Sequence, residues 1–241
     1  MTTTTKTKSI DIVPHENERQ MDIEGWNARW ESNPSWHAEK ARTEILDLMK
    51  TNVTDFKGKV FVPLCGASLD MVWLAEQGLQ VVGVEVSRLA IDKFYQEIYV
   101  KADYKITETS TTKIHKAGNI TIYEADLYNC QELMNEPVFD LIFDRASLIA
   151  INWEDREKYI DLMLKLLGEN SSKMSYFLQG MDYNKGEHLG PPHIFNEVSC
   201  RHYFGEKVND IKHLDRQAQG KRFTAQVECY QDLWVLGGGL K

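Results

Sequence analysis

Apolar and polar positions change period repeatedly along the chain, and the changes predict strands and helices in alternation. The residues from Val60 to Pro63 are continuously apolar, which is typical of a strand buried on both faces. A helical pattern begins near Leu69, and Gly78 stands where a C-cap glycine is expected. A second apolar run, Val81 to Glu85, completes a β–α–β unit. The pattern therefore predicts a parallel sheet at the centre of the fold.

The same alternation continues along the rest of the chain. Further helices are predicted at 26–30, 38–50, 88–99, 153–167 and 196–204, and further strands at 120–123, 139–144, 174–178, 208–214 and 226–236. The glycine of Ala117-Gly118-Asn119 predicts a hairpin, and a polar turn between the last two strands predicts antiparallel pairing. We therefore expect an α/β fold with a doubly wound, mostly parallel Rossmann-like sheet and an antiparallel edge.

Length, composition and charge limit the domain organisation and the classes of partner that the protein can have. Among the 241 residues, those from 21 to 241 suit a single domain, whereas residues 1–20 contain few large apolar side chains and are expected to form a disordered tail. The formal charge of −8 argues against nucleic acid or an anionic membrane as a partner. No apolar run approaches the roughly 20 residues that span a bilayer. The four cysteines are scattered without a CxxC pair, which predicts reduced thiols and a cytoplasmic location.

The turn after the first strand carries the strongest functional signal. Pro63-Leu64-Cys65-Gly66 contains one glycine, whereas dinucleotide-binding turns use three to bring the backbone close to a pyrophosphate. Glu85, about twenty residues further on, ends the second strand, where a carboxylate can bind ribose hydroxyls. S-Adenosylmethionine has no phosphate and needs only a tight turn and this acidic clamp. The pattern favours a methyltransferase, with a dehydrogenase and a non-catalytic α/β domain as alternatives.

Three more residues are expected at the carboxyl edge of the sheet. Asp126 follows the strand that ends near Tyr123, and it could recognise an adenine amino group or be a solvated loop residue. Asp144 and Arg145 end a buried strand. That pair could be structural, but its position beside the ligand crevice makes it the best candidate for contact with a substrate.

Aromatic and histidine residues give weaker signals. Trp26, Trp30 and Trp36 precede the first strand; each could simply pack in the core, but three so close together favour a lid. His193, in the loop after Gly190-Pro191-Pro192, could shuttle a proton or be a partly exposed loop residue. His188 and His193 have no third metal-ligating residue nearby in the sequence, so we expect no metal site.

Several segments in order resemble the thiopurine S-methyltransferase family. The similarity extends over about residues 22 to 236 and is stronger in combination than in any one segment. The segments are Val60-Phe61-Val62-Pro63-Leu64-Cys65-Gly66, Met71-Val72-Trp73-Leu74-Ala75, Gly78, Val81-Val82-Gly83-Val84-Glu85-Val86-Ser87, Phe139-Asp140-Leu141-Ile142-Phe143-Asp144-Arg145, Leu148-Ile149-Ala150-Ile151-Asn152, Gly190-Pro191-Pro192 and the tryptophan-bearing Trp26-Asn27-Ala28-Arg29-Trp30.

The resemblance implies a seven-stranded class I methyltransferase fold with an N-terminal helical lid. It also implies a monomer that uses S-adenosyl-L-methionine, releases S-adenosyl-L-homocysteine and methylates sulfur. The implied cofactor-binding residues are Trp26 and Trp30 over the cofactor, Leu64 and Gly66 at the first turn, Glu85 at the ribose, Asp126 and Leu127 beside the adenine, and Arg145.

The sequence departs from the family pattern mainly at the residues expected to surround the methyl acceptor. The implied substrate-binding residues are Trp36, Pro191, His193 and Arg222. Ala67 replaces the usual lysine, His193 the usual aromatic residue, and Trp36 a frequent phenylalanine. The catalytic residues are expected to be Arg145 and Asp144. Arg145 would favour the thiolate form of the acceptor, and either Asp144 or a water would accept its proton. The expected acceptor is a small aromatic or heterocyclic thiol; the alternatives are a halide, thiocyanate or inorganic chalcogen anion, or a binding domain without catalysis.

Overall fold

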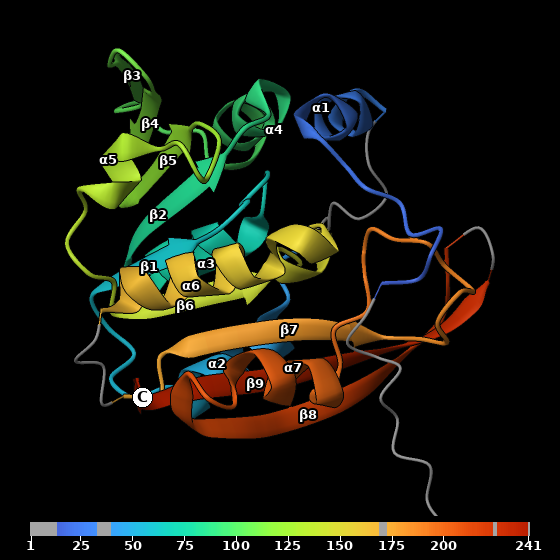
Figure 1. The fold of residues 1–241 in the computed structure, drawn as a ribbon. Helices are drawn as coiled ribbons and strands as arrows, with labels where there is room; N and C mark the ends of the chain where they lie inside the picture. Colours follow the sequence, from blue (N-terminus) through green and yellow to red (C-terminus); the bar gives the residue numbers. More distant parts are fainter. Residues whose placement is uncertain (1–13, 33–39, 169–172, 224–225, 241) are drawn as a thin grey trace, which may run out of the picture.

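A nine-stranded sheet forms the centre of the computed structural model, which describes residues 14–32, 40–168, 173–223 and 226–240 (Figure 1). The strands lie in the order β3-β4-β5-β2-β1-β6-β7-β9-β8. The block β5-β2-β1-β6-β7 is parallel, and antiparallel strands flank it on both sides. The strands are β1 Lys59–Val62, β2 Gln80–Glu85, β3 Lys105–Glu108, β4 Lys113–Ala117, β5 Ile120–Glu124, β6 Leu141–Arg145, β7 Tyr176–Asp182, β8 Val208–Arg222 and β9 Val227–Leu240.

The sheet is larger than the expected seven strands because a hairpin extends one edge. The pairing of β4 with β5 confirms the hairpin predicted at Ala117-Gly118-Asn119. β3 then pairs with β4, and all four of its residues are exposed. Because neither face of β3 is buried, its sequence carries no apolar alternation from which a strand could be predicted.

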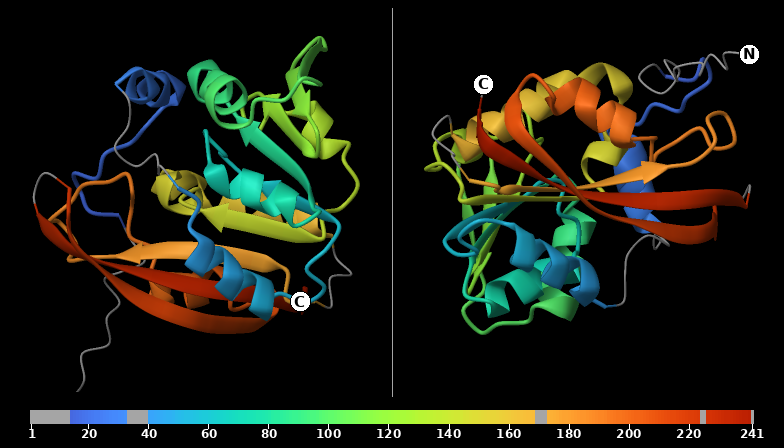
Figure 2. Two further views of the ribbon diagram at one scale, coloured as in Figure 1. Left: turned by 180° about the vertical axis from the view of Figure 1, so that it is seen from behind. Right: turned by 90° about the horizontal axis from the view of Figure 1, so that it is seen from below.

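Helices cover both faces of the sheet, as predicted for a doubly wound fold (Figure 2). One core cluster packs α2, α3 and α4 against the sheet, and the other packs α5, α6 and α7 against the opposite face. No helix in the described ranges is long and apolar enough to cross a membrane. The helices are α1 Ile23–Glu31, α2 Thr43–Asn52, α3 Leu69–Glu76, α4 Arg88–Lys93, α5 Gln131–Met134, α6 Arg156–Leu167 and α7 Glu197–Phe204, with a π-helical turn at Phe94–Ile98 and 3₁₀ turns at Leu148–Ala150 and Trp153–Asp155.

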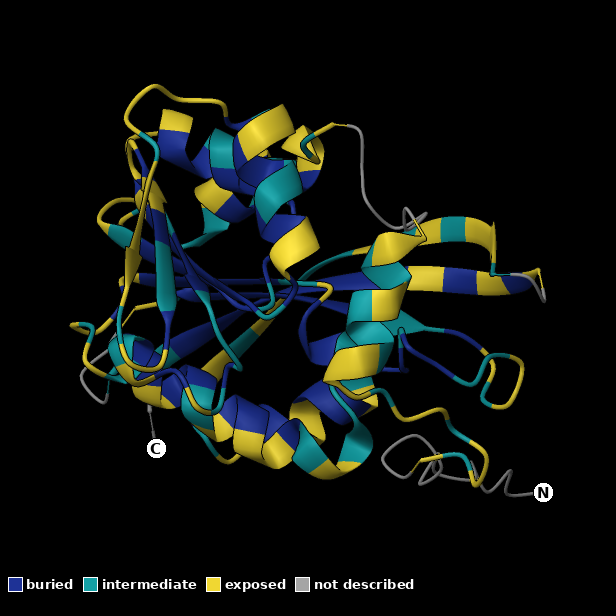
Figure 3. Ribbon diagram, turned by 90° about the horizontal axis from the view of Figure 1, so that it is seen from above, coloured by how far each residue is buried: buried dark blue, intermediate teal, exposed yellow. Residues whose placement is uncertain are grey.

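The last two strands are longer than predicted. The sequence predicts a polar turn at 215–225, but β8 continues to Arg222, where it pairs with Val227 of β9. Most side chains of β8 are exposed or half-buried, since this end of the hairpin extends beyond the core (Figure 3). Its polarity reflects exposure on both faces rather than a turn.

The N-terminal region contributes the predicted lid helix and an ordered approach to it. Helix α1 lies beside α4 and buries none of its residues completely (Figures 1 and 3). The Asp22 carboxylate caps it by accepting a hydrogen bond from Gly25 N at 2.8 Å. Residues 14–20 were expected to be disordered, but they are hydrogen-bonded to the loops that follow β6 and β7. The rest of the predicted tail, residues 1–13, lies outside the described residues.

Candidate active site

The turn after β1 brings Leu64, Cys65 and Gly66 beside the end of β2. Leu64 and Gly66 both have positive φ, 43° and 53°, a conformation that glycine adopts readily and leucine rarely. Cys65 N donates a hydrogen bond to the Val84 carbonyl at 3.0 Å, which ties the turn to the neighbouring strand. The result is a tight turn at the carboxyl edge of the parallel sheet, where α/β folds bind ligands.

Glu85 lies at the end of β2 with its carboxylate against this turn. Its Oε2 accepts a hydrogen bond from Gly66 N at 2.9 Å, and its Oε1 accepts one from Ser87 N at 2.7 Å. Burial raises the pKa of Glu85, although the backbone donors at Ser87 and Gly66 oppose this shift. Each carboxylate oxygen has a second lone pair, so the group can still accept hydrogen bonds from ribose hydroxyls. As an acceptor of hydrogen bonds, the Glu85 carboxylate therefore fits the ribose of an adenosine cofactor.

Helix α1 places an aromatic side chain over the same turn. A Cβ on Gly66 would lie 2.8 Å from Trp30 Cζ2, so only glycine allows the indole to lie this close to the backbone. Trp26, one helical turn earlier, is half-buried, and the Arg29 guanidinium lies 5.3 Å from its ring. The predicted lid helix therefore contacts the turn directly through Trp30.

Cys65 is buried within the turn. A Cβ on Gly83 would lie 2.6 Å from the Cys65 sulfur, so this glycine in β2 leaves room for the thiol. Burial raises the pKa of Cys65 well above its usual value, and the charge of Glu85 raises it further. The thiol is kept protonated, consistent with its interpretation as a small residue in a tight turn.

The residues predicted beside the adenine are engaged in local contacts. Asp126 Oδ1 accepts a hydrogen bond from Tyr128 N at 3.1 Å, and Oδ2 accepts one from Asn129 Nδ2 at 2.6 Å. Leu127 is buried in the core. The segment does lie next to the Glu85 strand, since Ala125 N donates to the Glu85 carbonyl at 3.1 Å. A contact of Asp126 and Leu127 with adenine stays a prediction.

Arg145 forms an ion pair that the sequence did not predict. Its guanidinium Nε pairs with Asp70 Oδ2, at the start of α3. Asp70 is 1% exposed, and its Oδ1 accepts a hydrogen bond from Arg42 N at 3.0 Å. The only hint in the sequence was that Asp70 follows the cofactor turn in the first turn of a helix.

Arg42 is close enough to Arg145 and Arg222 for their charges to act on it. The pKa of Arg42 is lowered first by burial and then by the charges of Arg145 and Arg222. Arg222 reaches this region from the exposed end of β8, where its Nη2 donates to Gln219 Oε1 at 3.0 Å. Among the described residues Asp70 forms an ion pair with Arg145, and the charges of Arg42 and Arg222 act in the same region, which suits it to an anionic ligand.

Asp144 does not face the crevice as expected. Its side chain is completely buried and accepts hydrogen bonds from Leu148 N at 3.0 Å, the Tyr159 hydroxyl at 2.8 Å and the Tyr176 hydroxyl at 2.7 Å. Burial raises the pKa of Asp144, and the three donors oppose that shift. The side chains of neighbouring strand residues point to opposite faces, so Arg145 pairs with Asp70 of α3 whereas Asp144 is enclosed in the core against α6 and β7.

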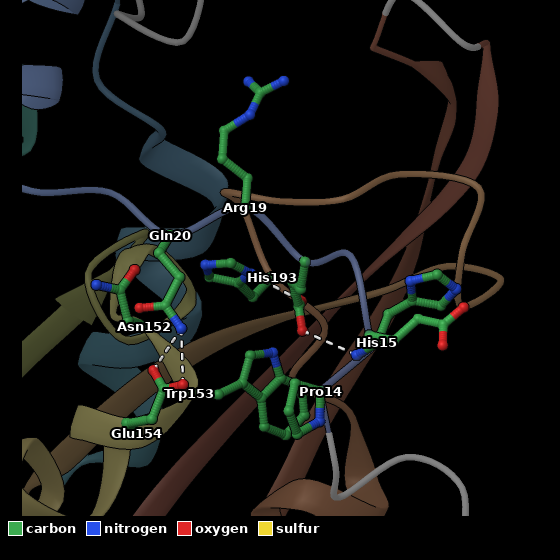
Figure 4. Close-up of a pocket in the computed structure, with 10 residues that line it drawn as sticks. Pro14, His15, Arg19, Gln20, Asn152, Trp153, Glu154 and His193 are labelled. Carbon is green, nitrogen blue, oxygen red and sulfur yellow. Dashed lines mark hydrogen bonds and ion pairs between the residues drawn. The ribbon is translucent and has the colours of Figure 1, made fainter.

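His193 is buried rather than partly exposed. Its ring Nδ1 lies 2.8 Å from Glu18 Oε1, and its backbone N donates to the Ile149 carbonyl at 2.7 Å. Both residues line a cavity of about 160 Å³ together with Trp153 and Asn152 (Figure 4). Pro191, two residues before His193, is also buried. Trp36 lies outside the described residues.

No group of histidine, cysteine, aspartate and glutamate side chains in the described ranges is arranged to hold a metal ion. The convergent groups are instead the backbone of the turn, one carboxylate at the end of β2, the indole of Trp30 and the guanidinium of Arg145.

Comparisons with known proteins give sequence relatives over most of the chain. The family model described as Thiopurine S-methyltransferase (TPMT) matches residues 21–237. The chain is 35% identical over 201 residues to the probable thiopurine S-methyltransferase of Danio rerio, covering 80% of this chain and 83% of that protein. It is 32% identical over 207 residues to the thiopurine S-methyltransferase of Equus caballus, covering 82% and 81%.

Solved structures share the fold at much lower identity. A SAM-dependent methyltransferase from Anabaena variabilis superposes with a TM-score of 0.59 at 15% identity, covering 93% of this chain and all of that chain. The N-methyltransferase NodS from Bradyrhizobium japonicum, in complex with S-adenosyl-L-homocysteine, gives 0.58 at 13%, covering 89% and 97%. These neighbours confirm the predicted fold, that of class I SAM-dependent methyltransferases.

Proposed function

Because the chain belongs to the thiopurine S-methyltransferase family, we propose that it transfers a methyl group from S-adenosyl-L-methionine to a small thiol, preferably aromatic or heterocyclic. The observation that carries this proposal is the family match over residues 21–237, which includes the cofactor turn and Glu85. S-Adenosyl-L-methionine supplies an electrophilic methyl group on a sulfonium. The protein has to bind this cofactor, hold the acceptor sulfur in line with the methyl carbon and keep that sulfur ionised.

The cofactor half of the site is assigned to the turn and the lid. Glu85 would bind the ribose hydroxyls through its remaining lone pairs, and Leu64 and Gly66 would lie beneath the cofactor. Trp30, which already contacts the turn, and Trp26 would cover it from α1. Covering the cofactor excludes water and restricts the approach of an acceptor, and such positioning supplies up to roughly 7–11 kcal/mol of a bimolecular barrier.

The acceptor half is assigned to the guanidinium groups. An ordinary thiol with a pKa of about 8.5 is only a few per cent ionised at neutral pH, and the thiolate is the nucleophile. Arg145, held by Asp70, would stabilise the anionic sulfur, with Arg222 and the Pro191 loop completing the pocket. Asp144 is committed to three donors in the core, so water takes the proton.

We further propose that the protein acts as a cytoplasmic monomer on small molecules, without a nucleic-acid or membrane partner. The net charge of −8 supports the absence of polyanionic partners, and the four free, buried cysteines suit a reducing compartment. Light scattering at micromolar concentration would test the monomer.

The test of the activity has two parts. Isothermal titration with S-adenosyl-L-homocysteine should give one site per chain with micromolar affinity. Product analysis with S-adenosyl-L-methionine should then show methylated sulfur with a heteroaromatic or aromatic thiol such as 4-nitrothiophenol. Binding without turnover on any thiol, halide or chalcogenide would leave a binding domain, whereas turnover on halide or thiocyanate but not on thiols would overturn the assigned acceptor.

A further inference from the structure

Residues Pro14–Met21, the N-terminal strap, connect the loops that follow β6 and β7. The strap begins beside the cavity of Figure 4 and leads directly into α1. It is attached at several points rather than lying loosely on the surface. The bonds are Arg19 N to the Leu189 carbonyl (2.7 Å), Met21 N to Asn152 Oδ1 (2.9 Å), Asn152 Nδ2 to the Met21 carbonyl (3.0 Å) and Gln20 Nε2 to the Glu154 carboxylate (2.7 Å).

The central contact of the strap is the pair formed by Glu18 and His193. Their side chains are 9% and 1% exposed, and Glu18 Oε1 lies 2.8 Å from His193 Nδ1. Burial raises the pKa of Glu18, but hydrogen bonds, with His193 the first of them, outweigh burial and lower it below its usual value. Glu18 is therefore an ionised acceptor in a nearly dry position, where a hydrogen bond is worth more than at the surface.

The charge of Glu18 also acts on a buried arginine, Arg156. Arg156 is completely buried, and its guanidinium nitrogens have no hydrogen-bond partner among the described residues. It lies 3.7 Å from the ring of Trp153, which lines the cavity with Glu18 and His193. Burial lowers the pKa of Arg156 to about 10, and Tyr203 and then the charge of Glu18 oppose that shift. Glu18 therefore offsets part of the cost of burying Arg156 as well as binding His193.

His193 also determines the shape of the loop before it. A Cβ on Gly190 would lie 2.2 Å from His193 Nδ1, so the imidazole packs against the backbone of residue 190. The His193 backbone N is bonded to Ile149, in the segment that follows Arg145. The imidazole thus packs against the backbone of Gly190 on one side and is hydrogen-bonded to Glu18 of the strap on the other (Figure 4).

We propose that Glu18 and His193 are positioning residues for the methyl acceptor: their hydrogen bond holds the Gly190–His193 loop in the shape that the acceptor thiol requires. The inference rests on the proposed function and adds to it a determinant of acceptor affinity. Loss of the Glu18–His193 bond should leave cofactor binding unchanged, because the hydrogen bonds between Asn152 and Met21 hold the strap next to α1 independently of Glu18.

A double-mutant cycle tests the pair. The variants are Glu18→Gln, which keeps the shape but removes the charge, His193→Phe, which keeps a ring but removes the hydrogen bond, and the two together. Steady-state kinetics with 4-nitrothiophenol and titration with S-adenosyl-L-homocysteine are measured for each. Glu16→Gln, an exposed carboxylate on the same strap, is the matched control.

Replacing a hydrogen bond to a charged group by a neutral one lowers its strength by about 1–1.5 kcal/mol, or roughly five- to tenfold. Glu18→Gln is therefore expected to raise the acceptor KM roughly five- to tenfold, while kcat and the Kd for S-adenosyl-L-homocysteine change less than about threefold. In the His193→Phe background the same change should have little further effect on KM.

Some outcomes would overturn the inference. An unchanged KM in Glu18→Gln with a lowered Tm would mean that the pair serves stability alone. Equal effects of Glu18→Gln in both backgrounds would mean that Glu18 does not act through His193. A wild-type protein that binds the cofactor but methylates no thiol would instead overturn the proposed function, and the positioning role with it.

Discussion

Replacing Glu85 by glutamine removes one charge from the cofactor site with almost no change in shape. The carboxylate accepts hydrogen bonds from Gly66 N and Ser87 N, one on each oxygen. A glutamine offers an oxygen to only one of them and turns its amide NH₂ towards the other, so one buried N–H loses its acceptor. An unsatisfied buried donor costs about 1–3 kcal/mol, which relief of the buried charge partly offsets.

The effect on cofactor binding should be larger. Hydrogen bonds to a charged group are worth about 1.5–3 kcal/mol and neutral ones about 0.5–1.5 kcal/mol. For two ribose hydroxyls the difference is about 2–3 kcal/mol, so Glu85→Gln should weaken S-adenosyl-L-homocysteine binding roughly 30- to 150-fold. Titration calorimetry measures this, with urea unfolding to establish that the variant is folded. Glu76→Gln, at the exposed end of α3, is the charge-removal control.

An affinity within twofold of the wild type in folded Glu85→Gln would refute the ribose assignment. The pH dependence gives a second check. Burial raises the pKa of Glu85, so the folded protein binds this proton more tightly than the unfolded chain does. As pH rises from the pKa of Glu85 in the unfolded chain through its pKa in the folded protein, the wild type should therefore lose unfolding free energy. Glu85→Gln should not show this loss. Cofactor affinity should change in the opposite sense and weaken as pH falls through the folded pKa of Glu85.

Three further substitutions test the rest of the site. Gly66→Ala would place a Cβ 2.8 Å from the Trp30 ring and hold a non-glycine residue at φ 53°. We expect urea unfolding to show a loss of about 1–2 kcal/mol in unfolding free energy, and calorimetry to show at least tenfold weaker cofactor binding. Unaltered cofactor binding would contradict the contact between the lid helix and the turn. Arg145→Ala should lower kcat/KM for the thiol at least about tenfold while the cofactor Kd stays within threefold, and unchanged methylation kinetics would remove Arg145 from its role. Asp144→Asn should reduce unfolding free energy by about 1–3 kcal/mol by disturbing three hydrogen bonds, with kcat preserved in the fraction that is folded; a large loss of kcat at full folding would restore Asp144 to the chemistry.

The parallel core of the fold follows directly from the sequence. Val60 to Pro63 and Val81 to Glu85 are continuous apolar runs because strands buried on both faces tolerate little else. The position of Glu85 against the turn could also be predicted, because the turn follows β1, Glu85 ends β2, and these two strands pair in parallel. Local pattern and tertiary structure agree there.

Elements and contacts outside that core could not be predicted in the same way. β3 and the far part of β8 are exposed on both faces, so their residues show no period of two. The Arg145–Asp70 pair and the Glu18–His193 pair join residues 75 and 175 positions apart, and a single sequence contains no signal for such pairings. Asp144 and Arg145 were assigned together because they are adjacent in sequence, but adjacent residues of a strand lie on opposite faces.

The burial of the cysteines has a consequence for an enzyme that methylates thiols. Cys65 forms part of the turn assigned to the methyl donor, and an ionised thiol there would compete with the acceptor for the methyl group. Burial raises the pKa of all four cysteines, Cys65, Cys130, Cys200 and Cys229, so each is kept as the protonated, weakly nucleophilic thiol. The fold thereby protects the protein from alkylating itself, and it leaves an incoming substrate as the sulfur nucleophile available to the donor.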